Sequence, residues 1–348
     1  MKIPNQVIKI KKYRVGIVGC GLIASRFEDD RLREHPCTHA GAYNSLPATE
    51  IVAAADTDRR RLKDFSDKWG TKNVYTDYRK MFKNENLDIL SVCTNTPSHA
   101  EITIAAAESG IKCIFCEKPI ASNLKDAEDM IKACKSNGVK LLVNHTRRWD
   151  SNYQKVRELL ASGTLGTLKF TTGYCPSGLL NNGTHMFDIL RYFVGDVDEV
   201  FGKTAAGDTD PGGYGLLTFK NKVYSFVDAA KREYLIFEID LHSSDGRIRI
   251  SDNGKKFELW SAKDSRNYMS IKELFAKEFP RPKVQKNSIV YAIEHLIDCM
   301  ENDARPICSG EDGKAALEIA LAIHESNKSG SEVRLPLKNK TLTVKTSK

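Results

Sequence analysis

Short hydrophobic runs alternate with amphipathic stretches over the first 145 or so residues of the chain. The runs lie at 13–18, 50–55, 87–93, 111–116 and 139–143. Runs of this length that are rich in β-branched residues are typical of strands buried on both faces of a parallel sheet. The stretches between them, such as 99–110 and 123–138, have helical periodicity. The pattern predicts a doubly wound α/β domain at 1–146.

From about residue 165 the pattern changes to strand-like segments joined by tight turns. The segments are LKFTTGYC, VFGKTAA, YGLLTFK, KVYSFVDAA, YLIFEIDLH, GRIRIS and KFELWSA. Asn221 and the Asp245-Gly246 pair are expected to supply the turn conformations of two hairpins. Helical stretches follow at 288–302 and 311–330. We predict an α+β domain at 147–348 with a large, mostly antiparallel, open-faced sheet, whose final helix could pack back on the first domain.

Length and composition limit the possible classes of protein. A chain of 348 residues is long enough for two domains with separate cores, and 41% hydrophobic with 28% charged residues is typical of a globular protein. No apolar run approaches the roughly 20 residues of a membrane span. The N-terminal segment lacks the apolar stretch of a signal peptide, so a cytosolic location is expected. The net charge of +8 is dispersed among acids, which does not favour nucleic-acid binding.

The cysteines indicate reduced thiols. There are nine, an odd number without a repeating pattern, as expected in a reducing compartment. Cys113 and Cys116 form a CxxC pair, but they lie within the predicted strand KCIFCE and should point to opposite faces. No other Cys/His cluster has metal-ligand spacing, so no metal site is predicted.

A charged segment, SRFEDDRLREHPCTH at 25–39, stands where the first helix should run unbroken. Pro36 is incompatible with the interior of a helix. Either the helix starts late or a loop interrupts it. Such a loop would lie near the ligand-binding edge of the sheet and could shape a substrate site.

The first hydrophobic run leads directly into GCGLIA at 19–24. Gly19 can adopt the backbone angles of a strand-to-helix turn, Gly21 lets the main chain approach a pyrophosphate, and Ala24 lets the helix pack on the strand. Leu22 and Ile23 then belong to a helix N-terminus whose free N–H groups favour an anion. The sequence predicts a dinucleotide-binding turn.

The second run ends in Asp56, which bears on the choice of dinucleotide. Its carboxylate can accept hydrogen bonds from a ribose 2′-hydroxyl and would repel a 2′-phosphate, so NAD is favoured over NADP. Arg59, Arg60 and Arg61 could hold a phosphate instead. The alternative is that they form a solvated first helical turn.

Lys118, in the EKP tripeptide at 117–119, is the first candidate for chemistry. Hydride transfer to or from a carbinol needs a group that moves the hydroxyl proton and an electropositive group near the oxygen. Burial next to a cationic nicotinamide would lower the pKa of Lys118, whereas Glu117 could counter that effect or orient the amine. The alternative is a lysine merely exposed at a strand end.

His185, in LLNNGTHMFDILRYFVG, is the second candidate. The preceding residues, Asn181 to Thr184, are of turn and N-cap types, which places His185 in the first turn of a helix. There the helix dipole disfavours imidazolium, so a neutral, proton-accepting ring is expected. Asp188 could orient His185 or simply complement the helix N-terminus. The alternative is a histidine near a helix start without a catalytic role.

Two polar loops offer further contacts. In CTNTPSH, small polar side chains can pass along the nicotinamide ribose, with Ser98 as the cap of the next helix. The candidates in this loop are Thr94, Asn95, Thr96 and His99. In NHTRRWD, Arg147 or Arg148 could hold an anionic or sugar substrate, and Trp149 could either stack on a ring or pack within the protein.

In this order, these residues resemble the Gfo/Idh/MocA family, the glucose–fructose oxidoreductase and inositol dehydrogenase family. The resemblance covers nearly the whole chain, through VGIVGCGLIA, AAAD, CTNTPSHAE, CEKPIA, GTHMFD, SGEDGKAALEIALAIHESNKSG and EVRLP. It implies a Rossmann domain, an α/β domain whose open sheet commonly mediates homo-oligomer contacts, tightly bound NAD(P), and a sugar or polyol substrate. It also implies Lys118 as a catalytic lysine and His185 as the proton-transferring histidine.

One position departs from the family pattern. Many polyol-oxidising members have an aspartate four residues before the histidine, where this chain has Asn181. An amide cannot take a proton, so an Asp–His relay is excluded. Members with an Asn before G-x-H include enzymes acting on nucleotide-linked sugars, which favours an activated or amino sugar near Asn181 and Asn182. The alternatives are NAD-recycling elimination or glycoside hydrolysis, and a non-catalytic dinucleotide-binding regulator.

Overall fold

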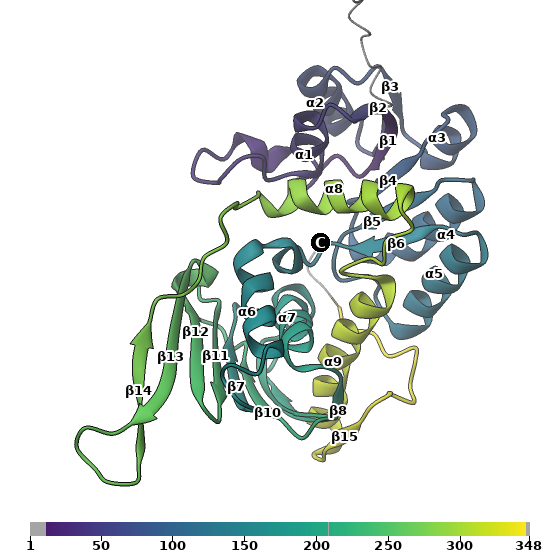
Figure 1. The fold of residues 1–348 in the computed structure, drawn as a ribbon. Helices are drawn as coiled ribbons and strands as arrows, with labels where there is room; N and C mark the ends of the chain where they lie inside the picture. The colour runs from purple at the N-terminus through teal and green to yellow at the C-terminus, as the bar shows by residue number, and fades with distance from the viewer. Residues whose placement is uncertain (1–11, 208, 346–348) are drawn as a thin grey trace, which may run out of the picture. The chain divides into compact units, whose positions relative to one another are not determined.

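The computed structural model describes residues 12–207 and 209–345 (Figure 1). Its contacts divide the chain into two compact units, and each consists of several segments. Unit 1 runs to Glu117 and includes Met130–Leu142 and Ile289–Pro306. Unit 2 contains Lys118–Asp129, Val143–Ser288 and the residues from Ile307 onward. The sequence pattern predicted a single domain boundary near 146. In the structure, each of the two units is instead made of several separate segments of the chain.

Unit 1 is built on a six-stranded sheet with the order β3-β2-β1-β4-β5-β6. The strands are β1 (Tyr13–Val18), β2 (Thr49–Ala55), β3 (Asn73–Tyr75), β4 (Ile89–Val92), β5 (Cys113–Cys116) and β6 (Lys140–Val143). The pairs β1–β2, β1–β4, β2–β3 and β4–β5 are parallel. Each predicted hydrophobic run forms a strand, which confirms the doubly wound fold. The short strand β3 was not predicted because its side chains are mostly exposed.

Helices connect these strands. They are α1 (His39–Ser45), α2 (Arg59–Trp69), α3 (Tyr78–Asn84), α4 (His99–Glu108) and α5 (Leu124–Ser136). Helix α8 (Ser288–Glu301) also contributes to unit 1, although it comes much later in the chain. Near its end, Glu301 accepts a hydrogen bond of 2.5 Å from the Tyr13 hydroxyl of β1. The sequence pattern did not predict that this later helix joins unit 1.

The first helix is interrupted by a loop, which decides between the two interpretations of segment 25–39. The N–H of His39 donates to the carbonyl of Ile23 at 3.1 Å, and that of Ala40 donates to Ala24 at 3.0 Å. Helix α1 therefore continues from the carbonyls of the glycine turn. Residues 25–38 leave the helix and return to it, and we call them the interrupting loop.

Unit 2 contains a nine-stranded sheet with the order β14-β13-β12-β11-β7-β10-β9-β8-β15. Its strands are β7 (Leu168–Tyr174), β8 (Val197–Thr204), β9 (Gly213–Phe219), β10 (Tyr224–Asp228), β11 (Glu238–Ser243), β12 (Gly246–Ser251), β13 (Lys256–Asp264), β14 (Lys272–Lys277) and β15 (Val333–Arg334). Only the central β7–β10 pair is parallel among the pairings of this sheet in the described residues. The mostly antiparallel sheet is confirmed, and β14 and β15 are additional to the prediction.

The two hairpin turns use other residues than expected. After β9 it is Lys222, not Asn221, that has a positive φ, of 64°. Gly246 has no positive φ, but a Cβ there would lie 2.5 Å from Leu165 Cδ2 and 2.7 Å from the Trp260 carbonyl oxygen. Glycine is needed at 246 for close packing rather than for turn geometry.

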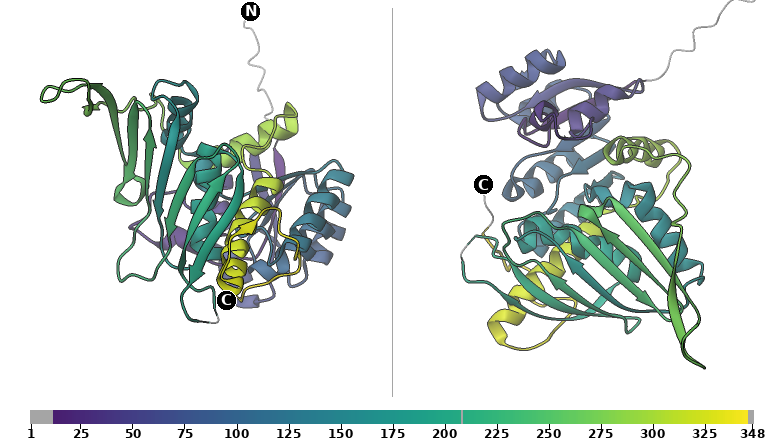
Figure 2. Two further views of the ribbon diagram at one scale, coloured as in Figure 1. Left: turned by 90° about the horizontal axis from the view of Figure 1, so that it is seen from below. Right: turned by 90° about the vertical axis from the view of Figure 1, so that its left-hand side faces the viewer.

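Helices cover one face of this sheet (Figure 2). They are α6 (Ser151–Ala161), α7 (Thr184–Val194) and α9 (Gly310–Ser329). Helix α9 approaches closely, because a Cβ at Gly202 or Gly215 would lie 2.9 Å from the Ile323 side chain. This helix belongs to unit 2, whereas the sequence left open that it might join the first domain.

Two predictions from composition can be compared with the structure. All nine cysteines are free thiols, as predicted. Among the helices of the described residues, none combines the length and the apolar character needed to cross a membrane.

Candidate active site

The glycine turn of unit 1 has the features expected for phosphate binding. Gly19 has a φ of 90°, and a Cβ there would lie 2.7 Å from the Cys93 carbonyl oxygen, so only glycine fits. No atom lies within 4 Å of the corresponding position at Gly21. The backbone N–H groups of residues 21–24 donate to no acceptor in the described part of the chain. An open surface with several free N–H groups suits an anion such as a pyrophosphate.

Asp56 is fixed at the end of β2. Its Oδ2 accepts the N–H of Cys20 at 2.8 Å, and its Oδ1 accepts that of Asp58 at 2.9 Å. Each carboxylate oxygen can accept more than one hydrogen bond, so the group can still bind sugar hydroxyls. The arginines at 59–61 lie exposed in the first turn of α2, which agrees with their interpretation as solvated residues.

The loop after β4 is held by its own side chains. His99 is 1% exposed, and its Nε2 lies 2.9 Å from the Thr94 carbonyl oxygen. Ser98 donates to Thr94 Oγ1 and to the Asn95 carbonyl instead of capping α4, so the predicted cap is wrong. The side chain of His99 therefore shapes this loop, while Thr94, Asn95 and Thr96 remain at least partly exposed.

Glu117 belongs to a buried network that the sequence did not reveal. Its Oε1 lies 3.0 Å from His39 Nε2, and His39 Nδ1 lies 2.9 Å from Ser91 Oγ. The Tyr43 hydroxyl is 2.9 Å from the same Ser91 oxygen. A buried carboxylate is costly unless it is hydrogen-bonded, and this network meets that need. No sequence motif links these positions, which come from α1, β4 and the end of β5.

In unit 2, Lys118 is paired with Asn181. The ammonium donates to Asn181 Oδ1 at 2.8 Å and to the Asn181 carbonyl oxygen at 3.1 Å, although the two residues are 63 positions apart. The sequence analysis named Lys118 and Asn181 as candidate site residues for different reasons and did not predict that they are in contact. Their direct contact places the amide and carbonyl oxygens of Asn181 against the ammonium of Lys118.

Asn181 lies in a π-helical turn, Leu179–Gly183, that runs into α7. The carboxylate of Asp210 accepts the N–H groups of Leu180 at 2.8 Å and Asn181 at 2.9 Å. Thr184 donates back to the Leu180 carbonyl, and α7 has no side-chain cap. His185 is the second residue of α7, in its first turn as predicted, but no side chain caps this helix, because the π-helical turn leads directly into it. Asp210 was missed because it is distant in sequence.

His185 has a pKa well below its usual value, chiefly because of burial and then because of the charges of Lys118, Arg147 and His145. Its Nδ1 is buried and has no hydrogen-bond partner in the described residues. The ring of His145 packs edge-on at a centroid distance of 5.4 Å. The lowered pKa has the direction expected from the sequence, and its causes are burial and the neighbouring positive charges.

Arg148 forms a buried ion pair. Its Nε and Nη2 donate to the two oxygens of Asp188, each at 2.8 Å, and further bonds reach the Ile307 carbonyl and Asp312. Arg148 is 5% and Asp188 1% exposed. The arginine's donors are thus taken up by contacts within unit 2, which does not favour the predicted role as a substrate ligand, and Asp188 orients Arg148 rather than His185.

The other candidate substrate-binding residues, Arg147, Trp149 and Asn182, differ in their burial and in their contacts within the protein. Trp149 is fully buried, which favours the alternative that it packs within the protein. Arg147 is half-buried, with its guanidinium 3.4 Å from the centroid of the Phe237 ring. Asn182 donates to the Ser177 carbonyl at 2.7 Å. Of the two arginines, Arg147 remains the candidate for substrate binding.

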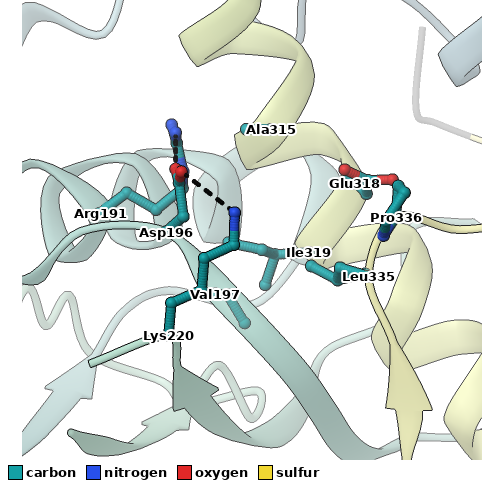
Figure 3. A pocket seen from close by; sticks show the side chains of 9 residues that line it. All are labelled: Arg191, Asp196, Val197, Lys220, Ala315, Glu318, Ile319, Leu335 and Pro336. Atoms are coloured by element: carbon teal, nitrogen blue, oxygen red, sulfur yellow. Dashed lines mark hydrogen bonds and ion pairs between the residues drawn. The ribbon is translucent and has the colours of Figure 1, made fainter. Parts of the chain in front are cut away.

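A separate cavity of about 290 Å³ lies elsewhere in unit 2 (Figure 3). It is lined by Arg191, Asp196, Val197, Lys220, Ala315, Glu318, Ile319, Leu335 and Pro336, none of them a predicted site residue. Asp196 pairs with Arg191 at 2.7 Å and with Lys220 at 3.6 Å. Glu318 accepts the N–H of Leu337 at 2.8 Å. These pairings give the lining charges a structural role.

Two family models match the chain. Residues 13–145 match the model described as "Oxidoreductase family, NAD-binding Rossmann fold". Residues 175–335 match the model described as "Oxidoreductase family, C-terminal alpha/beta domain". The first match lies within 1–146 and the second within 147–348.

Similar proteins include two full-length relatives. The D-apiose dehydrogenase of Paraburkholderia graminis is 28% identical, over 94% of this chain and 90% of its own length. The myo-inositol 2-dehydrogenase of Thermotoga maritima is 28% identical, over 92% of this chain and 98% of its own. Among solved structures, the WlbA dehydrogenase of Bordetella pertussis in complex with NADH and UDP-GlcNAcA has a TM-score of 0.78, at 22% identity and with 94% and 99% of the two chains covered. That structure supports the fold.

Proposed function

This chain belongs to the Gfo/Idh/MocA family of NAD-binding oxidoreductases, and on that premise we propose that it is an NAD-dependent dehydrogenase of a sugar or polyol carbinol. The observation that carries the proposal is the cluster of Lys118, Asn181 and His185 in unit 2. An ammonium held in place beside a neutral, buried imidazole is suited to deprotonating a hydroxyl group.

The roles of Lys118 and His185 in the proposed reaction follow from the positive charge of the lysine and the neutral ring of the histidine. In the oxidation direction the carbinol C–H hydrogen leaves as a hydride, which bound NAD accepts, and the O–H hydrogen leaves as a proton. His185 takes that proton on Nε2, because Nδ1 is buried. Lys118 donates a hydrogen bond to the carbinol oxygen and stabilises its developing negative charge. Asn181 orients the ammonium through two contacts.

The substrate class is proposed more narrowly from Asn181 and Arg147. Arg147 adds a positive charge near His185 and could bind a phosphate or carboxylate of the substrate. A nucleotide-linked or acidic sugar would use that charge, whereas a neutral sugar would not. Comparing kcat/KM on matched neutral and anionic sugars, in the wild type and in Arg147→Met, separates these classes.

The decisive variant is Lys118→Ala. We expect kcat to fall by about 10²–10⁴-fold, the usual contribution of a positioned proton-transfer or charge-stabilising group, while the Kd for NAD stays within about twofold. Lys125→Ala is the matched control, since Lys125 is exposed and pairs only with Asp129 among the contacts of its ammonium in the described residues. Full turnover in Lys118→Ala would contradict the proposal.

The same assay separates the alternative reactions. Net formation of NADH with a sugar oxidation product indicates a dehydrogenase. Turnover of substrate without a change in NADH absorbance would indicate NAD-recycling elimination or hydrolysis. Dinucleotide binding without turnover on a broad sugar panel would favour a regulator. The cytosolic location expected from the sequence stays a prediction.

We also propose a homo-oligomer through the helix-free face of the unit 2 sheet. Large apolar side chains line this face, and strand pairing makes them neighbours: Tyr224 lies opposite Phe170, and Phe226 lies opposite Leu216. Tyr224 is 54% and Leu216 47% exposed. A contiguous exposed apolar patch is typical of an interface, and a second copy presents the same patch.

The substitution Leu216→Asp tests this assembly. It should shift the mass measured by light scattering toward the monomer, because a buried unpaired carboxylate is costly in an interface. Leu274→Asp, on the peripheral strand β14, is the control and should leave the mass unchanged. A wild-type monomer at micromolar concentration would contradict the proposal.

A further inference from the structure

Three possible metal ligands meet in the interrupting loop of unit 1. A carboxylate oxygen of Glu28, Nδ1 of His35 and Sγ of Cys37 all lie within 4.8 Å of one another. Nδ1 of His35 is 2.8 Å from Glu28 Oε2 and 3.7 Å from Cys37 Sγ. The cluster plays no part in the proposed dehydrogenase chemistry, and it stands in the segment that the sequence marked as an unexplained insertion.

The carboxylate of Glu28 is held in a fixed position. Its Oε1 accepts hydrogen bonds from Cys37 N at 2.7 Å, Thr38 N at 2.9 Å and Thr38 Oγ1 at 3.0 Å. A Cβ at Gly41 would lie 2.2 Å from the same oxygen, so a larger residue at position 41 would displace the carboxylate. With Oε1 occupied, the other oxygen, Oε2, points to His35.

The base of the loop is fixed as well. Lys68 pairs with Asp29 at 2.7 Å, and the Trp69 indole donates to Ser25 Oγ at 2.8 Å. Both contacts tie the loop to the end of α2. The three ligand atoms are therefore presented by an anchored loop, which reduces the ordering cost of binding an ion.

We propose that Glu28, His35 and Cys37 form a zinc site with a fourth position open to solvent. A thiolate, an imidazole and a carboxylate are the ligand types that Zn²⁺ prefers, whereas Mg²⁺ and Ca²⁺ prefer all-oxygen sites. Zinc bonds of about 2.0–2.3 Å in tetrahedral geometry place ligand atoms roughly 3.3–3.8 Å apart. The sulfur–nitrogen distance already lies in that range, and the nitrogen–oxygen pair needs to open only slightly.

Charge and access also suit a dication. A thiolate and a carboxylate together neutralise Zn²⁺, so binding leaves no net charge from these groups. The side chain of His35 is 38% exposed, which gives the ion a route from solvent. The loop leaves the helix directly after the glycine turn, so an ion here would stiffen the segment beside that turn.

Cobalt(II) provides the test, since it replaces zinc and gives a thiolate-to-metal charge-transfer absorption. The experiment uses the full, untagged chain, stripped with a chelator and titrated with Co²⁺. We expect a charge-transfer band that saturates at one equivalent and is displaced by Zn²⁺. Added Zn²⁺ should also raise the thermal unfolding temperature.

Three variants assign the band. Cys37→Ser should abolish it, and His35→Gln, at an exposed side chain, should weaken Zn²⁺ binding by at least tenfold. Cys299→Ser is the control, because Cys299 Sγ lies 3.5 Å from His295 Nε2 and forms another Cys–His pair. It should leave the band unchanged. Circular dichroism and the NAD Kd establish that each variant is folded.

The outcomes are distinct from those of the proposed function. No band in the wild type, a full band in Cys37→Ser, or loss of the band in Cys299→Ser would overturn the zinc site. None of these results depends on turnover, so the site and the dehydrogenase proposal stand or fall separately.

Discussion

The glycine turn of unit 1 and the Lys118–His185 cluster of unit 2 are assembled in different ways. The turn presents the backbone N–H groups of consecutive residues. Its conformation depends on the positive φ of Gly19, which favours glycine. The cluster is made of side chains from distant segments, with Lys118 and Asn181 63 residues apart. The first depends on local backbone conformation, whereas the second depends on buried charges elsewhere in unit 2.

This difference has an energetic consequence. Backbone N–H groups cost little to leave solvated at a surface turn, so the turn needs only the right backbone angles. The cluster keeps an imidazole neutral beside positive charges, and the same helix, α7, carries Asp188, which forms a buried ion pair with Arg148. Substitutions that disturb buried charge should therefore be more damaging than those that trim the dinucleotide site.

The largest effect on stability is expected for Asp188→Ala. The substitution leaves Arg148 buried and without its bidentate partner, which should lower the free energy of unfolding by about 3–5 kcal/mol. Asp198→Ala is the control, since its partner Lys222 is exposed, and a change below about 1 kcal/mol is expected. Urea unfolding measures both. Equal losses would mean that the buried pair is no more important than a surface pair.

An intermediate effect is expected for Asp56→Asn in the dinucleotide site. The amide keeps an acceptor for only one of the two backbone N–H groups of Cys20 and Asp58, and it removes the charge that favours a ribose 2′-hydroxyl, so the Kd for NAD should rise about tenfold. The Kd for NADP should fall in the same variant. Calorimetry with both dinucleotides measures the two constants. Unchanged preference would show that Asp56 does not select the cofactor.

The smallest effect is expected for His185→Gln on the pH dependence of stability. The pKa of His185 is lower in the folded protein than in the unfolded chain, so the unfolded chain binds the extra proton as the pH falls through about 6.5. This costs the wild type at most about 0.7 kcal/mol of stability between pH 7 and pH 6. Glutamine does not titrate, so the variant should lose less over that interval, as urea unfolding at the two pH values would reveal. An equal loss would contradict the buried neutral ring.

The elements that the sequence predicted well are those defined by neighbouring residues. The hydrophobic runs of unit 1 predicted β1, β2, β4, β5 and β6, and Gly19 predicted the turn, because each signal is confined to a few consecutive positions. At His185 the local pattern predicted the first helical turn but not how that helix begins. Asn181 to Thr184 have the composition of a helix cap, but the distant carboxylate of Asp210 supports a π-helical turn there instead.

Long-range partners account for the other differences. Arg148 and Trp149 have side chains typical of a binding loop, and only the fold shows that both are buried. The sequence also did not predict three contacts between distant residues. These are the contacts of His145 with His185, of His39 with Glu117, and of Asp210 with the backbone of Leu180. The Glu28–His35–Cys37 cluster was missed for a related reason, since its ligand spacing follows no common metal motif and the loop must fold before the atoms meet.

The central claim, a neutral His185 whose pKa is lowered by burial and by Lys118, is tested most directly by NMR titration of the His185 ring. The wild type is predicted to show a protonation midpoint for this ring well below the ordinary value, and Lys118→Met should move the midpoint upward. A wild-type midpoint at or above the ordinary value of about 6.5, unchanged by the loss of Lys118, would contradict the account.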